Sequence, residues 1–304
     1  MSDATATSPR VTVIIATYNW APVLSYSIGS VLDQTFADFE LLVIGDGCTD
    51  DSAEVVAGVG DPRVHWHNLD DRFGHQAGPN NEGIRRARGE LIAYLGHDDL
   101  WTPRHLELLL EAVDAGTPFV HSGTLWVHPS RRPSPWPPPR WVYTPGWVPP
   151  TTVLHSRNLA LAVGGWRPPH ATGALDPDGD LWERMAASVG PPRFVAGLTS
   201  VKISAAQRRD VYRDRPSHEQ AYWLARIRAT GDPEGALLAA SKQRYVYVTR
   251  VWRHRLSRPV TILRGSVRAR TRLRARGLLP QAKVTTADKR LRRQQRFKGI
   301  DVER

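Results

Sequence analysis

The stretch GELIAYLGHDD, from Gly89 to Asp99, decides the fold class that this sequence predicts. It is an apolar segment of strand length that ends in two adjacent carboxylates, Asp98 and Asp99. In an open α/β sheet, ligands bind outside the carboxyl ends of the strands, where this pair would lie. Two neighbouring carboxylates repel each other unless a cation or proton lies between them, and Mg²⁺ and Mn²⁺ prefer oxygen ligands. The alternative is a solvated pair ahead of a helix that begins at Thr102.

Segments on both sides of this stretch alternate between strands and helices. Val11–Ala16 and Phe39–Gly45 are continuous apolar runs, which are typical of parallel strands covered on both faces. Helices are expected over Pro22–Leu32, after Asp51, around Asn81–Ala87 and over Thr102–Ala115, and further strands over Val64–His67, over Glu90–Leu95 and from Phe119. This alternation predicts right-handed crossovers and an α/β fold with a doubly wound, mostly parallel, Rossmann-like sheet.

The charge is distributed unevenly along the 304 residues. The formal net charge is +11, yet residues 242–304 contain 20 Lys or Arg and 3 Asp or Glu, which leaves the rest of the chain at −6. We therefore predict a globular domain over residues 1–240 and a basic, largely helical C-terminal extension over residues 241–304. Pro129–Pro150 is rich in proline and tryptophan, and we expect it to be an extended loop.

The lack of a recognisable targeting signal and the single cysteine lead us to expect a cytoplasmic protein. The polar N-terminus does not resemble a signal peptide, no apolar run is long enough to span a bilayer, and the single cysteine, Cys48, excludes an internal disulfide. The basic extension is a candidate contact to anionic lipid on the inner membrane face. A solvated helix or an oligomer contact is the alternative, and nucleic acid ranks last because aromatic residues are not interleaved with the basic ones.

The order of several short motifs resembles that of family 2 glycosyltransferases. VIIATYN (13–19) is similar to VIIPTYN, QTFADFE (34–40) to QTxxxxE, GDGCTD (45–50) to DDGSTD, NEGI and ARGE (81–90) to NxGIxxAxGE, GGW (164–166) to GGF, and GDLW (179–182) to EDxxLW. Several weak motifs in one consistent order are more specific than any one of them. The resemblance implies a GT-A-like fold and an inverting transfer of a sugar from a nucleoside diphosphate donor, UDP first, to a hydroxyl of a glycan or lipid-linked acceptor.

The same resemblance implies roles at the ends of two strands. Asp46 would bind the nucleobase and Asp98 the ribose, while Asp99 would bind a divalent cation, Mn²⁺ or Mg²⁺, that bridges the diphosphate. Such a cation stabilises the negative charge that develops on the leaving group. The alternative for Asp46 is an acid at a helix N-terminus, favoured there by the helix dipole.

Four further positions would complete the donor site. The backbone of Ala16 and Thr17 would lie along the base, and Tyr18 would stack on it unless it is a core aromatic residue. Asn80 stands where many members of the family have an arginine near the diphosphate.

Asp180 is the predicted general base. A sugar hydroxyl is a poor nucleophile unless a positioned carboxylate removes its proton as it attacks. Asp176, Asp178 and Asp180 alternate along the chain, and the resemblance to EDxxLW selects Asp180. The alternative is that Asp180 only caps the helix expected over Leu181–Ala187.

Two other functions compete with glycosyl transfer. One is a catalytically degenerate protein that binds a nucleotide or glycan and recruits partners through its basic tail. The other is a nucleotidyltransferase, which is disfavoured because the glycine- and lysine-rich phosphate loop expected of one is missing from the sequence. Hydrolysis of a nucleotide sugar in the presence of a divalent cation would separate an enzyme from a binding protein.

Overall fold

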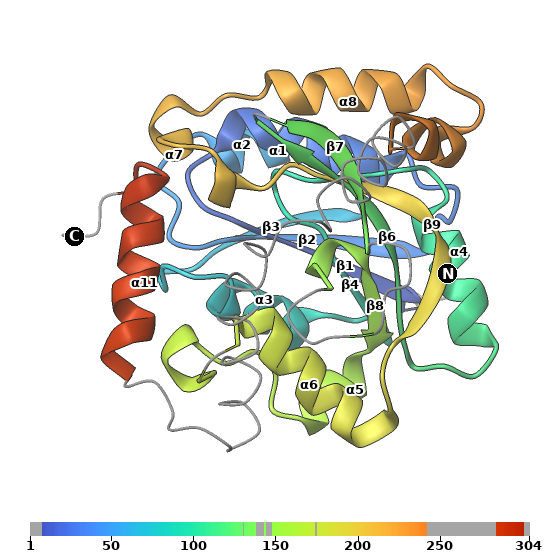
Figure 1. Cartoon of the computed structure of the whole chain (residues 1–304), viewed down its shortest axis with the longest axis horizontal. Helices are drawn as coiled ribbons and strands as arrows, with labels where there is room; N and C mark the ends of the chain where they lie inside the picture. Colours follow the sequence, from blue (N-terminus) through green and yellow to red (C-terminus); the bar gives the residue numbers. More distant parts are fainter. Residues whose placement is uncertain are drawn as a thin grey trace, which may run out of the picture.

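A computed structural model describes residues 8–129, 131–137, 143, 148–173, 175–241 and 284–300. Within these residues, one sheet of nine strands runs through the molecule with helices on both faces (Figure 1). The strands are β1 (Val11–Thr17), β2 (Phe39–Gly45), β3 (Val64–Asn68), β4 (Leu91–Tyr94), β5 (Leu100–Trp101), β6 (Phe119–His128), β7 (Arg131–Trp136), β8 (Val153–Ser156) and β9 (Arg193–Lys202).

The sheet has the order β3-β2-β1-β4-β8-β6-β9-β5, and β7 pairs with β6 beside this path. The first four strands are parallel, as are β6 and β9. Strands β8, β5 and β7 are antiparallel to their partners. The predicted α/β fold with a mostly parallel sheet is therefore confirmed, with antiparallel strands added in its second half.

Two layers of helices cover the sheet. Helices α1 (Ala21–Leu32), α2 (Ser52–Ala57) and α4 (His105–Asp114) pack on one face. Helices α3 (Ala77–Arg86), α5 (Arg157–Ala162) and α6 (Pro177–Val189) pack on the other. The remaining elements are η1 (Pro150–Thr152), η2 (Pro169–Ala171), η3 (Ala205–Gln207), α7 (Val211–Asp214), α8 (His218–Arg228) and α11 (Val284–Phe297).

The helices on both faces of the sheet explain the continuous apolar runs in the sequence. Alternate residues of β1 face opposite sides, so Val13 and Ile15 join the core under α1 while Ile14 joins the core over α3. All three side chains are fully buried. A strand covered on both faces needs apolar residues at every position, and for this reason the run is continuous rather than alternating.

Two sequence expectations about element boundaries were wrong. The segment Pro129–Pro150 is not entirely loop, because β7 pairs with β6 despite its prolines. Proline is tolerated there because β7 lies beside the main path of the sheet, where one side of the strand needs no ladder partner. Helix α6 begins at Pro177 rather than Leu181, so Asp178 and Asp180 lie in its first turn.

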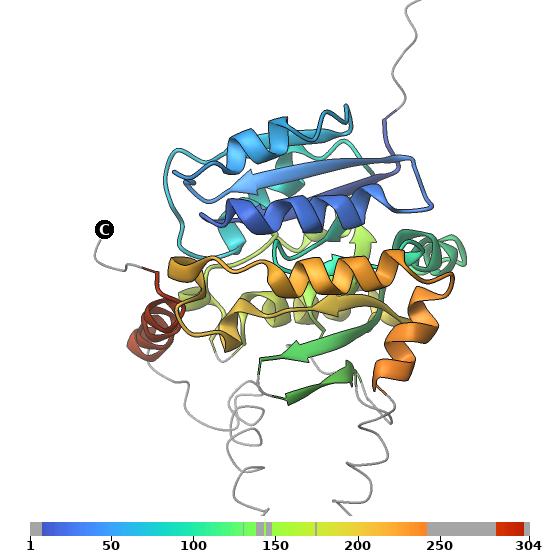
Figure 2. The same cartoon turned by 90° about the horizontal axis from the view of Figure 1, so that it is seen from above.

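Part of the basic extension folds back onto the domain. Helix α11 stands beside the sheet edge where the parallel strands end (Figures 1 and 2). The Gln295 side chain donates to the Gly74 carbonyl, and the backbone N–H groups of Asp210 and Tyr212 donate to the carbonyls of Phe297 and Lys298. Residues 242–283, on which most of the predictions for the tail depend, lie outside the described part of the chain, and the predicted boundary at residue 240 stays a prediction.

Among the helices that the structure describes, none combines the length and apolar character needed to cross a bilayer.

Gly89 lets the turn before β4 approach β1 closely. A Cβ atom there would lie 2.6 Å from the backbone nitrogen of Thr12, and backbone cannot move aside as a side chain can. We expect Gly89→Ala to lower the free energy of unfolding by about 1–3 kcal/mol, as overpacking does elsewhere. Urea denaturation measures this. Gly231→Ala, where an added Cβ meets nothing within 4 Å, is the matched control and should leave stability nearly unchanged.

Candidate functional site

Asp98 and Asp99 lie where the sequence predicts, in the turn beyond the end of β4, and both are buried. One oxygen of Asp98, Oδ2, accepts the backbone N–H of Ala205 at 2.7 Å. Asp99 Oδ1 accepts the backbone N–H of Ile203 at 2.9 Å. Gly96 is required here, because a Cβ atom at this position would lie 2.7 Å from Asp99 Oδ2.

The second oxygen of Asp99 is held by two side chains. The hydroxyl of Thr151 donates to Oδ2, and the Lys202 ammonium lies 2.7 Å from the same atom. Burial raises the pKa of the Asp99 carboxyl, and the nearby Lys202 charge opposes that rise. Burial disfavours the charged lysine, but the charges of Asp99 and Asp98 more than offset this and raise its pKa. The pair is therefore a buried ion pair.

A divalent cation does not fit Asp99 in this arrangement. Both carboxylate oxygens already accept hydrogen bonds, and one of the donors carries a full positive charge. A cation bound at Oδ2 would be close to that ammonium group and repelled by it. Within the described ranges, no three His, Cys, Asp or Glu side chains are grouped as metal ligands. The metal role predicted for Asp99 stays a prediction, and its contacts do not favour it.

Two acids in the first turn of α6 have different surroundings. Asp180, the predicted base, is buried and accepts a hydrogen bond from Arg184 Nε at 2.9 Å, with Arg167 at 3.8 Å. Asp178 lies close enough to Lys202 for the two charges to affect each other. Burial, with a smaller contribution from the charge of Asp176, raises the pKa of Asp178 to about 6.

The structure therefore places Asp178 near Lys202 and holds Asp180 in an ion pair with Arg184. The signal for Asp178 was present in the sequence. Counting back from Leu181-Trp182, the six-residue element EDxxLW puts its aspartate at position 178. Lys202 had no comparable signal in its neighbouring residues, and in the structure it is the last residue of β9.

Asp46 directly follows β2, as predicted, and is buried. Its two oxygens accept the backbone N–H groups of Phe73 and Gly74, each at 2.8 Å, so that it shapes the loop before α3. Burial raises the pKa of Asp46, and these two hydrogen bonds oppose the rise. Gly45 replaces an acid of the family pattern because a Cβ atom there would lie 2.4 Å from Asn68 Oδ1. The base-binding role of Asp46 stays a prediction.

The residues at the end of β1 face the same edge of the sheet. Ala16 is partly exposed, and Thr17 is buried and bonds through its hydroxyl to His97 Nδ1 at 2.9 Å. The ring of Tyr18 is not a core aromatic residue but is partly exposed, and the Arg72 guanidinium lies over it, 4.1 Å from its centroid. Arg72 is therefore a cation at the predicted base position that sequence analysis missed.

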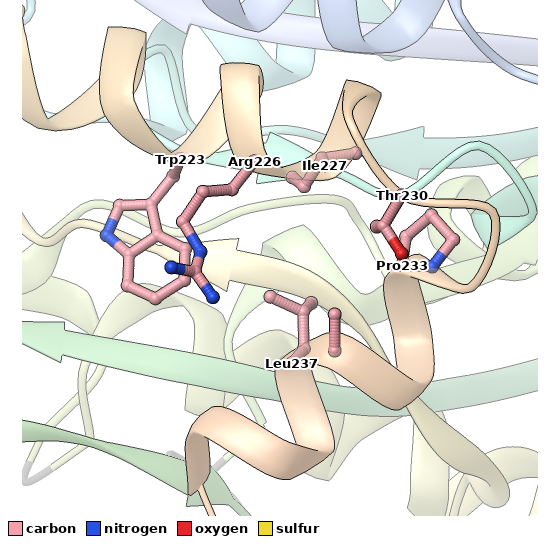
Figure 3. A pocket seen from close by; sticks show the side chains of 7 residues that line it. Trp223, Arg226, Ile227, Thr230, Pro233 and Leu237 are labelled. Atoms are coloured by element: carbon pink, nitrogen blue, oxygen red, sulfur yellow. The ribbon is translucent and has the colours of Figure 1, made fainter.

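Asn80 is buried within α3, and its predicted place near the diphosphate stays a prediction. His97 is packed between Thr17 and Tyr212, whose hydroxyl lies 3.1 Å from Nε2, and burial lowers its pKa. A separate small hollow between α8 and residues 233–237 is lined by Trp223, Arg226, Ile227, Thr230, Pro233, Ala236 and Leu237 (Figure 3). None of the predicted site residues lines this hollow.

Comparison with known proteins gives partial matches. The chain is 38% identical over 104 residues to an uncharacterized glycosyltransferase of Nostoc sp., which is 34% of this chain and 32% of that protein. It is 38% identical over 107 residues to the succinoglycan biosynthesis protein ExoO of Rhizobium meliloti, 35% of this chain and 30% of that one. The Escherichia coli UDP-Glc:alpha-D-GlcNAc-diphosphoundecaprenol beta-1,3-glucosyltransferase WfgD is 37% identical over 98 residues, 32% of this chain and 38% of its own. The matches span about a third of the length of these relatives.

Solved structures share the fold at low sequence identity. TarS of S. aureus superposes with a TM-score of 0.53 at 16% identity, covering 71% of this chain and 42% of TarS. The mannosyltransferase PcManGT of Pyrobaculum calidifontis, solved with GDP-Man and Mn²⁺, gives 0.51 at 18% identity, covering 94% of this chain and 88% of its own. The shared architecture includes the mostly parallel sheet and the helices on both of its faces.

The sequence also matches a family description, Glycosyl transferase family 2, over residues 12–165. This range contains β1, β2, β4 and the Asp98–Asp99 pair and makes up half of the chain. The chain belongs to glycosyl transferase family 2.

Proposed function

We propose that this protein transfers a sugar from a nucleoside diphosphate donor to a hydroxyl group of a glycan or lipid-linked acceptor. One observation carries the proposal: in a family 2 domain, Asp98, Asp99, Asp178 and Lys202 come together from separate elements at the ligand edge of the sheet. Two relatives, a succinoglycan biosynthesis protein and a glucosyltransferase named for a diphosphoundecaprenol-linked sugar, support an acceptor of this kind.

The donor would lie along the ends of β1, β2 and β4. Ala16, Thr17 and Tyr18 would border the base together with Asp46, and Asp98 would bind the ribose. UDP is the first nucleotide to test, because the E. coli relative is named for UDP-Glc, and GDP is the second, because the Pyrobaculum structure contains GDP-Man.

Transfer would proceed by one direct displacement with inversion. The acceptor oxygen forms a bond to the anomeric carbon while the bond from that carbon to the diphosphate oxygen breaks. The electron pair leaves with the nucleoside diphosphate, and the hydroxyl proton passes to a carboxylate of α6. Because both oxygens of Asp99 are bonded to protein groups, no step is routed through a divalent ion.

The carboxylate that accepts the proton is, in this proposal, Asp178. Its pKa of about 6 is near neutrality, where a general base is most effective. Among the described residues no arginine forms an ion pair with Asp178, whereas Arg184 pairs with Asp180. Asp180, which the sequence predicted, would orient the first turn of α6 through Arg184.

A panel of nucleotide sugars tests the function itself. The full chain is assayed by thermal shift and for release of nucleoside diphosphate with UDP- and GDP-sugars, with and without Mn²⁺. A bound ligand raises the melting temperature because it stabilises only the native state. Release of diphosphate supports the proposal, binding without release supports the degenerate binding protein, and the absence of both would overturn it.

Paired variants distinguish the two acids of α6. We expect Asp178→Asn to reduce kcat by about 10²–10⁴-fold, the usual contribution of a general base, with the Kd for UDP unchanged. Asp180→Asn should lower kcat by less than about tenfold while it lowers stability through the lost Arg184 pair. The reverse ranking of the two kcat values would restore Asp180 as the base.

The pH profile gives an independent check on Asp178. A general base works only when deprotonated, so kcat/KM should fall as the pH drops through about 6 and level off above it. A stopped or coupled assay between about pH 5 and 8 follows this profile. Asp178→Asn should lose the inflection, and a wild-type profile that stays flat through this range would contradict the assignment.

A further inference from the structure

The position beside Asp99 that the sequence assigns to a cation is taken by a protein group. Lys202 Nζ lies 2.7 Å from Asp99 Oδ2, and its charge also interacts with Asp98 and Asp178. Its side chain is only 17% exposed, so this contact is part of the buried site rather than a surface pairing. The same carboxylate is held by Thr151 and Ile203, which fix it in this orientation.

A second lysine, Lys298 of the basic extension, lies near enough to the site for its charge to interact with that of Asp98. Lys298 follows α11, and its carbonyl accepts the Tyr212 backbone N–H at 2.8 Å, which ties the end of this helix to the segment beside His97. Burial lowers the pKa of the Lys298 ammonium group, the charge of Asp98 opposes that lowering, and the charge of Lys202 adds to it. The Gln295 side chain donates to the carbonyl of Gly74, whose own N–H donates to Asp46. Helix α11 and the residues after it therefore contact both the Gly74 loop and the Tyr212 segment at the ligand edge of the sheet.

The charges of Asp98 and Asp99 are offset at this edge without a metal ion, while Asp178 adds a third carboxylate near Lys202. The carboxylates of Asp98 and Asp99 would repel an incoming diphosphate, and two ammonium groups neutralise them. Lysine is a compact point charge with three donors and is widely used to bind phosphate. A divalent ion at Asp99 would have to displace Lys202 from a buried ion pair and leave that lysine unpaired, which is strongly unfavourable.

We propose that Lys202 and Lys298 take the place of the divalent cation and bind the donor diphosphate, so that this protein needs no metal ion. The inference rests on the proposed function, because it concerns the diphosphate of the same donor. The two ammonium groups donate N–H bonds to phosphate oxygens and stabilise the charge that remains on the diphosphate when its bond to the sugar breaks. No proton or electron is exchanged with the lysines in this step.

The first test uses the unaltered full-length protein and isothermal titration calorimetry. UDP and GDP are titrated in EDTA and again with Mn²⁺, and Mn²⁺ is titrated alone. We expect one of the nucleotides to bind with the same Kd in both buffers, no stoichiometric binding of Mn²⁺, and donor hydrolysis that EDTA does not reduce. Nucleotide binding that appears only with Mn²⁺ would overturn this inference and leave the proposed function standing. Failure of both nucleotides to bind under either condition would overturn both.

Single substitutions then assign the effect to the two lysines. Lys202→Met and Lys298→Met should each raise the Kd for the nucleoside diphosphate about tenfold or more, the effect of losing a charge-assisted hydrogen bond, and leave the Kd for uridine or guanosine unchanged. Arg226→Met, an exposed cation on α8, is the matched control and should change neither. Unchanged diphosphate affinity in both lysine variants would overturn the inference.

Lys202→Met has a second consequence that a purely structural lysine would not produce. With the ammonium group gone, the Asp98–Asp99 pair is free to accept a cation, so Mn²⁺ binding should appear and should restore part of the diphosphate affinity. Melting temperatures of all variants identify any that fail to fold. If Lys202→Met fails to fold, the EDTA and Mn²⁺ measurements on the unaltered protein still decide the outcome.

Discussion

The buried ion pair between Asp99 and Lys202 is the constraint on which the site depends. Removing two charges from water is costly, and a buried pair persists only when its remaining lone pairs and protons are bonded. Here the Thr151 hydroxyl and the Ile203 backbone N–H complete the carboxylate. Thr151 lies in η1 and Ile203 follows β9, so the Asp99 carboxylate links the turn after β4 to both of these segments. The contacts that determine the charge state of Asp99 therefore also hold this edge of the sheet together.

The C-terminal helix, α11, also contributes contacts at this edge of the sheet. Helix α11 is separated from the domain by about forty residues in the sequence, yet its end hydrogen-bonds to the segment around Tyr212 and to the loop around Gly74. Tyr212 in turn contacts His97, the residue before Asp98. Through Lys298 the basic extension adds one lysine near Asp98 at this edge.

Many of the elements could be predicted from the sequence because their cause is local. The continuous apolar runs in β1 and β2 follow from burial on both faces, and the motifs between Val13 and Asp99 identified the family. The exceptions also have local causes. Strand β7 was missed because its prolines exclude an interior strand but not one beside the main path of the sheet. Strand β5 has two residues, too few to show a period.

The sequence by itself determined the α/β fold, the family and the set of acids at the strand ends. Burial on both faces of a strand gives a continuous apolar run, and the family motifs consist of neighbouring residues, so both can be recognised in the sequence. Only the tertiary structure decided which charges lie together: Lys202 with Asp99, Asp178 near Lys202, and Asp180 with Arg184. The physical reason is that a side chain's charge acts through space over a few ångströms. Residues 99 and 202 meet because β5 pairs with β9, and this pairing has no signal in the local composition of either strand.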